Sequence, residues 1–417
     1  MSEVLHIELA SGLKLLCKAN RANPTVSFQI SVAAGAAADP RGKAGLAGFA
    51  RALLTKGTAK HDAAWIAEKI DSLGIELGFS TGNHTTSLSV RALAENLRPA
   101  LRLVRELLAE PAPPADEMER MRERILAAIK LREDNPAAVA VDRLHEMIYG
   151  RNHPYGRTAR GTRRSVARIG LDDITAFYRE RLLPGAAVGA VVGDVDLDAV
   201  EDLAAATLGR WRGGGEFALK APRTVAPPEE PVEKRIGMPE KTQSDIALGF
   251  QGIRRLDPDY YALQVGNSVL GRLSLGGRIG QWVRDTEGMA YYAFTTFDAG
   301  VGAGPFMFRA GVDPGNVART VKLALNELRR TRDGGITADE MENAILFLGG
   351  GVARQVETNG GLAAALLSQE IFGLGDDHYL RYESILRSLT LDDVNRALAN
   401  HLHPDNYHLA VAGPETQ

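Results

Sequence analysis

The side chains able to hold a metal or act as nucleophiles do not fall at the spacings of known catalytic motifs. None of the nine histidines belongs to His-x-x-Glu-His or His-x-x-Glu. His401 and His403 are two residues apart at a predicted helix end, which directs their side chains to opposite sides. No segment matches a Walker phosphate loop or a Gly-x-Ser-x-Gly nucleophile turn. Because an isolated histidine is most often a surface or capping residue, histidine spacing predicts no site.

Composition excludes further classes of site and partner. The single cysteine, Cys17, excludes an internal disulfide and a cysteine-based zinc cluster. A formal net charge of −3 gives no electrostatic reason to expect nucleic acid or an anionic membrane as a partner. The N-terminal segment has no basic stretch before an apolar run, and no apolar run reaches the roughly 18–20 residues that a membrane span needs. We therefore expect a cytoplasmic protein, or a periplasmic one if a leader has been removed.

One stretch of the chain occurs twice. Leu171–Gly193 reads LDDITAFYRERLLPGAAVGAVVG, and Leu391–Gly413 reads LDDVNRALANHLHPDNYHLAVAG. At an offset of 220 without a gap, 8 of the 23 positions are identical, where average composition predicts roughly one or two. Each copy predicts a helix capped by an Asp pair, a Pro that prevents its continuation, and an apolar strand that ends at Gly. A repeat at constant offset indicates a duplicated domain.

The elements around the repeat define the fold class. In each half, strand patterns lie early and late around a run of helical patterns, which favours the α+β class over strict alternation. Residues 213–231 are rich in Gly, Pro and charge, which predicts a linker. We therefore expect two homologous domains, 1–212 and 232–417, each an antiparallel-type sheet with a layer of helices. Together they are predicted to form a clamshell with a ligand cleft.

The helical segment Gly45–Thr58 (GLAGFARALLTKGT) resembles the signature helix of the pitrilysin/insulinase-type zinc peptidases, or inverzincins. That helix reads roughly G-x-A-H-F-L-E-H-M-L-F-K-G-T, and the matching residues are Gly45, Ala47, Phe49, Leu54, Lys56, Gly57 and Thr58. The resemblance places the first zinc histidine at Gly48, the general-base glutamate at Arg51 and the second histidine at Ala52. The third ligand of the family is a glutamate in a stretch like L-E-E-I-x-x-x-E-D-N-P, and it falls on Ala128.

All four catalytic positions have therefore lost their function. Zinc needs nitrogen, oxygen or sulfur donors, and Gly48, Ala52 and Ala128 supply none. Arg51 places a fixed positive charge where a zinc dication would bind in the family. We predict no metal and no cofactor in this chain, and the resemblance implies zinc in a partner subunit. It extends to the strand Glu76–Thr81, where catalytic members bind substrate and Gly78 replaces a common Asn, and to His153–Arg157 (HPYGR).

The second half keeps a pair of functional residues. Leu270–Tyr291 is similar to the family's L-G-G-x-x-S-R-L-x-x-x-L-R-E-x-x-G-L-A-Y, with matches at Arg284, Gly288, Ala290 and Tyr291. In that family the Arg and the Tyr reach the substrate beside the zinc, so the resemblance implies a catalytic role for Arg284 and Tyr291 in a partner's site. Guanidinium and phenol groups are donors suited to a carbonyl or a developing oxyanion. The alternative is an Arg favoured by a helix end and a Tyr packed on a strand.

The resemblance implies the non-catalytic subunit of a heterodimeric peptidase. This chain would supply Arg284, Tyr291 and half of a peptide chamber to a partner that carries His-x-x-Glu-His. A second hypothesis is a structural or peptide-holding protein, like the core subunits of respiratory complexes that share this fold. A third is a hydrolase with an unrelated site, for which the sequence offers no nucleophile–base pair.

Overall fold

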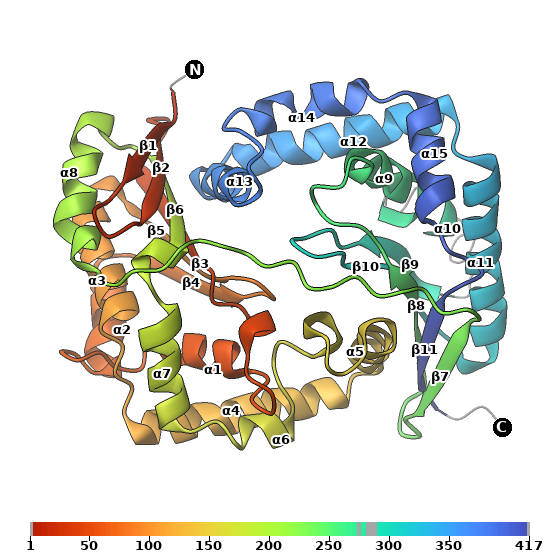
Figure 1. Cartoon of the computed structure of the whole chain (residues 1–417), viewed down its shortest axis with the longest axis horizontal. Coiled ribbons are helices and arrows are strands. Elements are labelled where there is room, and N and C mark those ends of the chain that lie inside the picture. The colour runs from red at the N-terminus through yellow and green to blue at the C-terminus, as the bar shows by residue number, and fades with distance from the viewer. Residues whose placement is uncertain (1–2, 273–276, 281–289, 415–417) are drawn as a thin grey trace. The chain divides into compact units, whose positions relative to one another are not determined.

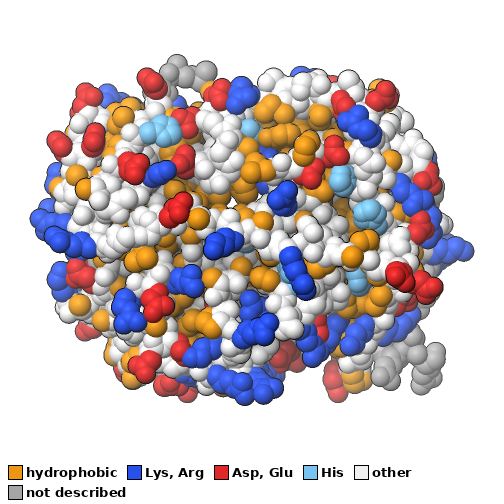
Figure 2. Space-filling view, viewed as in Figure 1, with side chains coloured by type: hydrophobic (Ala, Val, Ile, Leu, Met, Phe, Trp, Pro, Cys, Tyr) orange, Lys and Arg blue, Asp and Glu red, His pale blue; other side chains and the backbone are white. Residues whose placement is uncertain are grey.

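The structure is a computed structural model that describes residues 3–272, 277–280 and 290–414. Basic and acidic side chains intermingle over the face shown in Figure 2. None of the helices in the described ranges is both long and apolar enough to cross a membrane.

Two sheets of the same design organise the chain (Figure 1). Across the first sheet the strands are β1 (Leu5–Glu8), β2 (Lys14–Ala19), β6 (Ala187–Gly193), β3 (Thr25–Val32), β5 (Thr86–Leu93) and β4 (Glu76–Thr81). Across the second they are β7 (Val232–Gly237), β11 (His408–Gly413), β8 (Ser244–Gln251), β10 (Pro305–Val312) and β9 (Ala290–Phe297). In each sheet one pair is parallel, β2–β6 or β7–β11, and the others are antiparallel. The predicted α+β class with two antiparallel-type sheets is confirmed.

Helices pack against both sheets. In the first half they are α1 (Leu46–Leu53), α2 (Ala63–Ser72), α3 (Leu97–Ala109), α4 (Ala115–Glu133), α5 (Pro136–Tyr149), α6 (Arg163–Val166), α7 (Leu171–Arg181) and α8 (Leu197–Thr207). In the second half they are α9 (Tyr260–Asn267), α10 (Arg278–Gly280), α11 (Val317–Gly334), α12 (Ala338–Val356), α13 (Asn359–Phe372), α14 (His378–Arg387) and α15 (Leu391–His401). Residues 213–231 contain no helix or strand, as the linker composition predicts.

The repeated stretches occupy equivalent places. Helix α7 leads to β6, which lies between its parallel partner β2 and β3, and α15 leads to β11, which lies between β7 and β8. The second Asp of each pair begins its helix in the same way. Asp173 accepts the Gly170 N–H at 2.9 Å, and Asp393 accepts the Thr390 N–H at 3.0 Å. These matching topologies support the duplication.

The compact units of the chain differ from its sequence halves 1–212 and 232–417. One unit comprises residues 1–129, 158–219 and 353–379, and the other comprises 130–157, 220–352 and 380–417. The reason is a reciprocal exchange of one helix: α5 packs on β8 and β11 of the second sheet, while α13 packs on β6 and β3 of the first (Figure 1). Three of the boundaries between the units fall inside helices, namely α4, α12 and α14.

Each exchanged helix covers the second face of the sheet on which it packs. Leu144 and Ile148 of α5 join Ala247, Ala410 and Ala412 in one apolar cluster. On the first sheet, the corresponding cluster contains Leu16, Val188, Ala190, Val192, Leu362, Ala363, Leu366 and Leu367. Every residue of β6 and of β11 is consequently buried, which explains why both strands are apolar apart from His408 at the start of β11.

Candidate functional site

The degenerate zinc positions lie on α1 and α4 of the first unit. Helix α1 begins after Gly45, whose φ of +95° is a conformation that favours glycine. The Asp39 carboxylate accepts the N–H groups of Gly45 and Ala47 at 2.7 and 3.0 Å, which fixes the start of the helix. Its apolar face, with Leu46, Phe49 and Leu53, is buried in the core.

The other side of α1 carries three of the positions that the resemblance aligns with zinc ligands and the general base. Gly48, Arg51 and Ala52 are partly buried, and Ala128 of α4 is exposed. Helix α4 runs past α1, with the Arg122 guanidinium 5.5 Å from the centre of the Phe49 ring. The four positions therefore belong to two neighbouring helices, and three of them have no side-chain donor. Their assignment to a former zinc site stays a prediction.

Arg51 gives the structural test of whether zinc fits here. Its Nε is buried and has no hydrogen-bond partner in the part of the chain that the structure describes. Burial, followed by the positive charge of Arg160, lowers the pKa of Arg51. A cation without a carboxylate partner among the described residues, beside positions without donors, does not fit a zinc ion.

Of the two candidate residues in the second half, Tyr291 is among the described residues, and it lies on the edge strand β9. Its side chain is 89% exposed and lines an open groove of about 640 Å³ in the second unit. The groove is also lined by Leu131, Asp134, Asn135, Pro136, Ala137, Lys241, Thr242, Gln243, Asp245 and Tyr292. Arg284 and Gly288 lie outside the described residues, so the predicted pairing of Arg284 with Tyr291 stays a prediction.

A β-bulge displaces Tyr291 from the regular ladder. Tyr292 pairs with Gly311 and Ala290 pairs with Val312, so Tyr291 has no residue opposite it. Bulges at sheet edges commonly redirect a side chain near a site.

Beside the bulge, Tyr292 and Asp245 form a fixed polar pair. The Tyr292 hydroxyl donates to the Asp245 carboxylate. Burial raises the pKa of Asp245, and it also raises the pKa of Tyr292. Sequence reasoning missed this pair, because Asp245 and Tyr292 lie on strands β8 and β9, which β10 separates.

The two other segments of the resemblance, His153–Arg157 and strand β4, pack against neighbouring parts of the protein. His153 Nδ1 accepts the Tyr155 N–H at 3.1 Å, and its ring also bonds the Arg223 carbonyl at 2.9 Å. The Tyr155 hydroxyl accepts the Gly302 N–H at 2.9 Å, which ties this turn to the loop before β10. On the edge strand β4, a Cβ at Gly78 would lie 2.6 Å from Ser89 Oγ, so a side chain there requires Ser89 to move.

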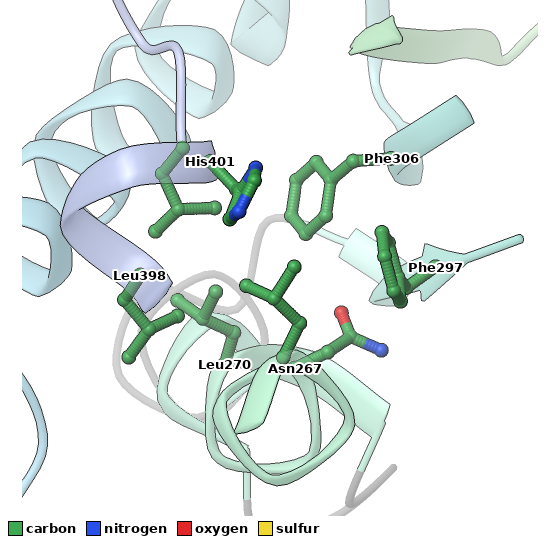
Figure 3. Close-up of a pocket in the computed structure, with 8 residues that line it drawn as sticks. Asn267, Leu270, Phe297, Phe306, Leu398 and His401 are labelled. Atoms are coloured by element: carbon green, nitrogen blue, oxygen red, sulfur yellow. The ribbon is translucent and has the colours of Figure 1, made fainter. Parts of the chain in front are cut away.

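A group of metal-type ligands occurs elsewhere among the described residues. Atoms of Asp257, Asp259 and His401 lie within 4.8 Å of one another. His401 Nε2 is 2.9 Å from an Asp259 carboxylate oxygen, a contact that joins the end of α15 to the start of α9. The His401 ring also borders a small apolar pocket with Phe306 and Leu398 (Figure 3). Spacing along the chain could not reveal this group, because 142 residues separate His401 from Asp259.

Comparisons with known proteins agree with these observations. Residues 14–163 match the family described as insulinase (peptidase family M16), and residues 168–348 match the peptidase M16 inactive domain. An uncharacterized zinc protease of Mycobacterium leprae is 28% identical over 424 residues, covering 99% of this chain and 92% of that protein. A similar protein of Bacillus subtilis, also an uncharacterized zinc protease, is 25% identical over 407 residues, with 97% of each chain covered.

A solved structure extends the similarity to the fold. A peptidase M16 inactive domain from Pseudomonas fluorescens is 28% identical, with a TM-score of 0.92 over 100% of this chain and 98% of that one. The order of strands, the degenerate signature helix and the matches to both family descriptions agree. This chain therefore belongs to the pitrilysin/insulinase family of peptidases, M16.

Proposed function

We propose that this chain is the non-catalytic subunit of a two-subunit M16 peptidase. It supplies Arg284 and Tyr291 to the site of a zinc-bearing partner and contributes half of the chamber that holds the peptide. The exposed Tyr291 at a bulge over an open groove carries this proposal. The loss of every zinc ligand on α1 and α4 supports a role that depends on a partner.

The chemistry of the groove suits a peptide. Tyr291 offers a phenolic donor to a substrate carbonyl or to an oxyanion that develops on it. Strand β9 lies at the edge of its sheet, and the edge of a sheet presents backbone donors and acceptors to a further strand. Leu131, which is 73% exposed on the same groove, adds an apolar contact.

The experiment is to copurify the partner from the native host, identify it by a His-x-x-Glu-His sequence and by bound zinc, and reconstitute peptide cleavage. Tyr291→Phe removes one hydroxyl and keeps the ring. Loss of an oxyanion donor lowers turnover by roughly two to three orders of magnitude, whereas loss of a ground-state contact raises KM and leaves kcat nearly constant. Arg284→Ala is expected to be at least as damaging, because no other side chain offers a planar fork of donors.

Tyr379→Phe is the matched control, because it removes a hydroxyl from a partly buried tyrosine that does not line the groove. It is expected to cleave at the wild-type rate. Complex formation is verified for each variant by gel filtration before rates are compared. Wild-type kcat and KM in intact complexes of both Tyr291→Phe and Arg284→Ala would contradict the proposal and favour a structural or peptide-holding protein.

A further inference from the structure

Arg51 is a partly buried cation whose positive charge no described carboxylate neutralises. Its Nε is enclosed by protein without an acceptor, while the side chain as a whole is only partly buried. Among the described residues, no Asp or Glu forms an ion pair with it within 4.0 Å. Removing a cation from water without a partner costs free energy. A side chain in this state gains from any anion that reaches its terminal nitrogens.

The nearest charge makes this imbalance larger. Arg160, an exposed residue of the loop after Tyr155, is close enough to lower the pKa of Arg51 through repulsion. Arg160 likewise has no carboxylate partner among the residues that the structure describes. Two cations held near each other define a region of positive potential, which attracts one anion more strongly than either cation does alone.

The lost zinc ligands leave room beside this pair. A Cβ on Gly48 would find a single heavy atom within 4 Å, the Ala159 carbonyl oxygen at 3.6 Å. Ala52, one turn further along α1, adds only a methyl group. The side of the helix that holds histidines in zinc-bearing members therefore has free space at Gly48, and Arg51 lies between positions 48 and 52 in the sequence.

We propose that the degenerate zinc position binds a carboxylate, held by Arg51 and Arg160. A guanidinium matches the geometry of a carboxylate with paired N–H donors, and charge-assisted hydrogen bonds are stronger than neutral ones. The carboxylate comes from the free C-terminus of a peptide or from an Asp or Glu side chain within it. Only the choice of a peptide as its carrier rests on the proposed function.

The test uses the full chain without any partner and measures peptide binding by isothermal titration calorimetry. One probe is an N-acetylated pentapeptide with a free C-terminal carboxylate, and a second is the same peptide as its C-terminal amide. A third is that amide with one internal Asp. The wild-type chain is expected to bind at least one carboxylate-bearing peptide about tenfold or more tightly than the uncharged amide. The preferred one identifies the source of the carboxylate.

Variants assign the preference to this site. Arg51→Met keeps most of the side-chain volume without the charge and is expected to abolish the preference. Arg160→Met, at an exposed position, is expected to reduce it and tests the site even if Arg51→Met folds poorly. Arg98→Met removes an exposed arginine from α3 and is expected to leave it unchanged. Equal affinity of the wild-type chain for all three peptides, no binding of any of them, or full preference in both Arg51→Met and Arg160→Met would overturn the inference.

This experiment is independent of cleavage. Loss of carboxylate preference with normal cleavage in the reconstituted complex would refute only the inference. Slow cleavage is expected from Tyr291→Phe, whose residue lies in the other compact unit.

Discussion

Gly48, Arg51, Ala52 and Ala128 are predicted to be four individual losses, each with a separate chemical effect. According to the resemblance, three of them remove zinc ligands, and the fourth replaces a base by a cation. The backbone that presented them is retained, because Asp39 still fixes the start of α1 and the buried side of that helix is intact. Restoring a metal is therefore a question of side chains rather than of fold.

We expect the quadruple variant Gly48→His, Arg51→Glu, Ala52→His and Ala128→Glu to bind one zinc ion per chain. Two histidines and a glutamate complete a three-ligand set, and the open space at the Gly48 Cβ accommodates a side chain. Each of the four single variants should remain zinc-free, as should the wild-type chain at this site. Elemental analysis after dialysis against zinc, with and without a chelator, measures this. Zinc at this site in any single variant would contradict the fourfold loss.

At the residue scale the sequence could identify which positions matter but not their surroundings. The family motif located Gly48, Arg51, Ala52, Ala128 and Tyr291. It could not show that Arg51 Nε lacks a partner or that Tyr291 lies in a bulge. Both properties depend on contacts made by distant segments, and no local pattern encodes them.

At the scale of single elements, α5 and α13 are essential to sheets that they do not adjoin in sequence. Leu144 and Leu366 are fully buried, one on each helix, and belong to apolar clusters on different sheets. The sequence predicted a run of helices in each half, and α5 and α13 belong to these runs. Their placement was not predicted, because an amphipathic pattern specifies that a face is buried and not which sheet buries it.

Leu144→Ala and Leu366→Ala should each destabilise the protein by about 2–5 kcal/mol, the usual cost of a cavity at a well-packed leucine. Denaturant unfolding monitored by circular dichroism measures the change. Leu131→Ala, at an exposed leucine of α4, is the control and should change stability by less than about 0.5 kcal/mol. A neutral effect at either buried leucine would argue that its helix does not cover the sheet.

The Asp393 carboxylate at the start of α15 is expected to make the thermal stability of the protein depend on pH. The hydrogen bond from the Thr390 hydroxyl, followed by that from the Thr390 backbone N–H, lowers the pKa of Asp393 to about 2. An unfolded Asp titrates near a pKa of about 3.9. The capping contribution is therefore fully present above pH 4 and is lost as the pH falls toward 2. Asp393→Asn should melt at a lower temperature than the wild type at pH 7, and this difference should shrink at pH 2.5. An unchanged difference would show that the charge of Asp393 is unimportant.

At the scale of the whole molecule, the duplication was readable from the sequence and the exchange was not. The constant offset of 220 predicted two copies, and the matching strand orders agree with it. The arrangement of the two copies as a clamshell stays a prediction. Offsets relate equivalent segments but do not reveal which copy a helix packs on, so the segment 1–212 describes a repeat rather than a compact unit.

Residues 1–212 expressed alone should fail to form a compact, soluble domain. They lack α13, so Leu16, Val188, Ala190 and Val192 lose their apolar cover. Coexpression with residues 213–417 should restore a soluble complex, which gel filtration and cooperative thermal melting can identify. A soluble 1–212 fragment with a cooperative transition would show that α13 is dispensable.

The exchanged helix also governs the order in which the protein can fold during its synthesis. Helix α13 ends at Phe372 of a 417-residue chain. The first sheet is therefore complete in sequence at Gly193 but lacks its second covering layer until most of the polypeptide has left the ribosome. Helix α5, made early, must likewise wait for β8 and β11. Nascent chains are expected to expose an apolar sheet face from the synthesis of Gly193 until that of Phe372, and we expect ribosome-associated chaperones to bind them during this interval.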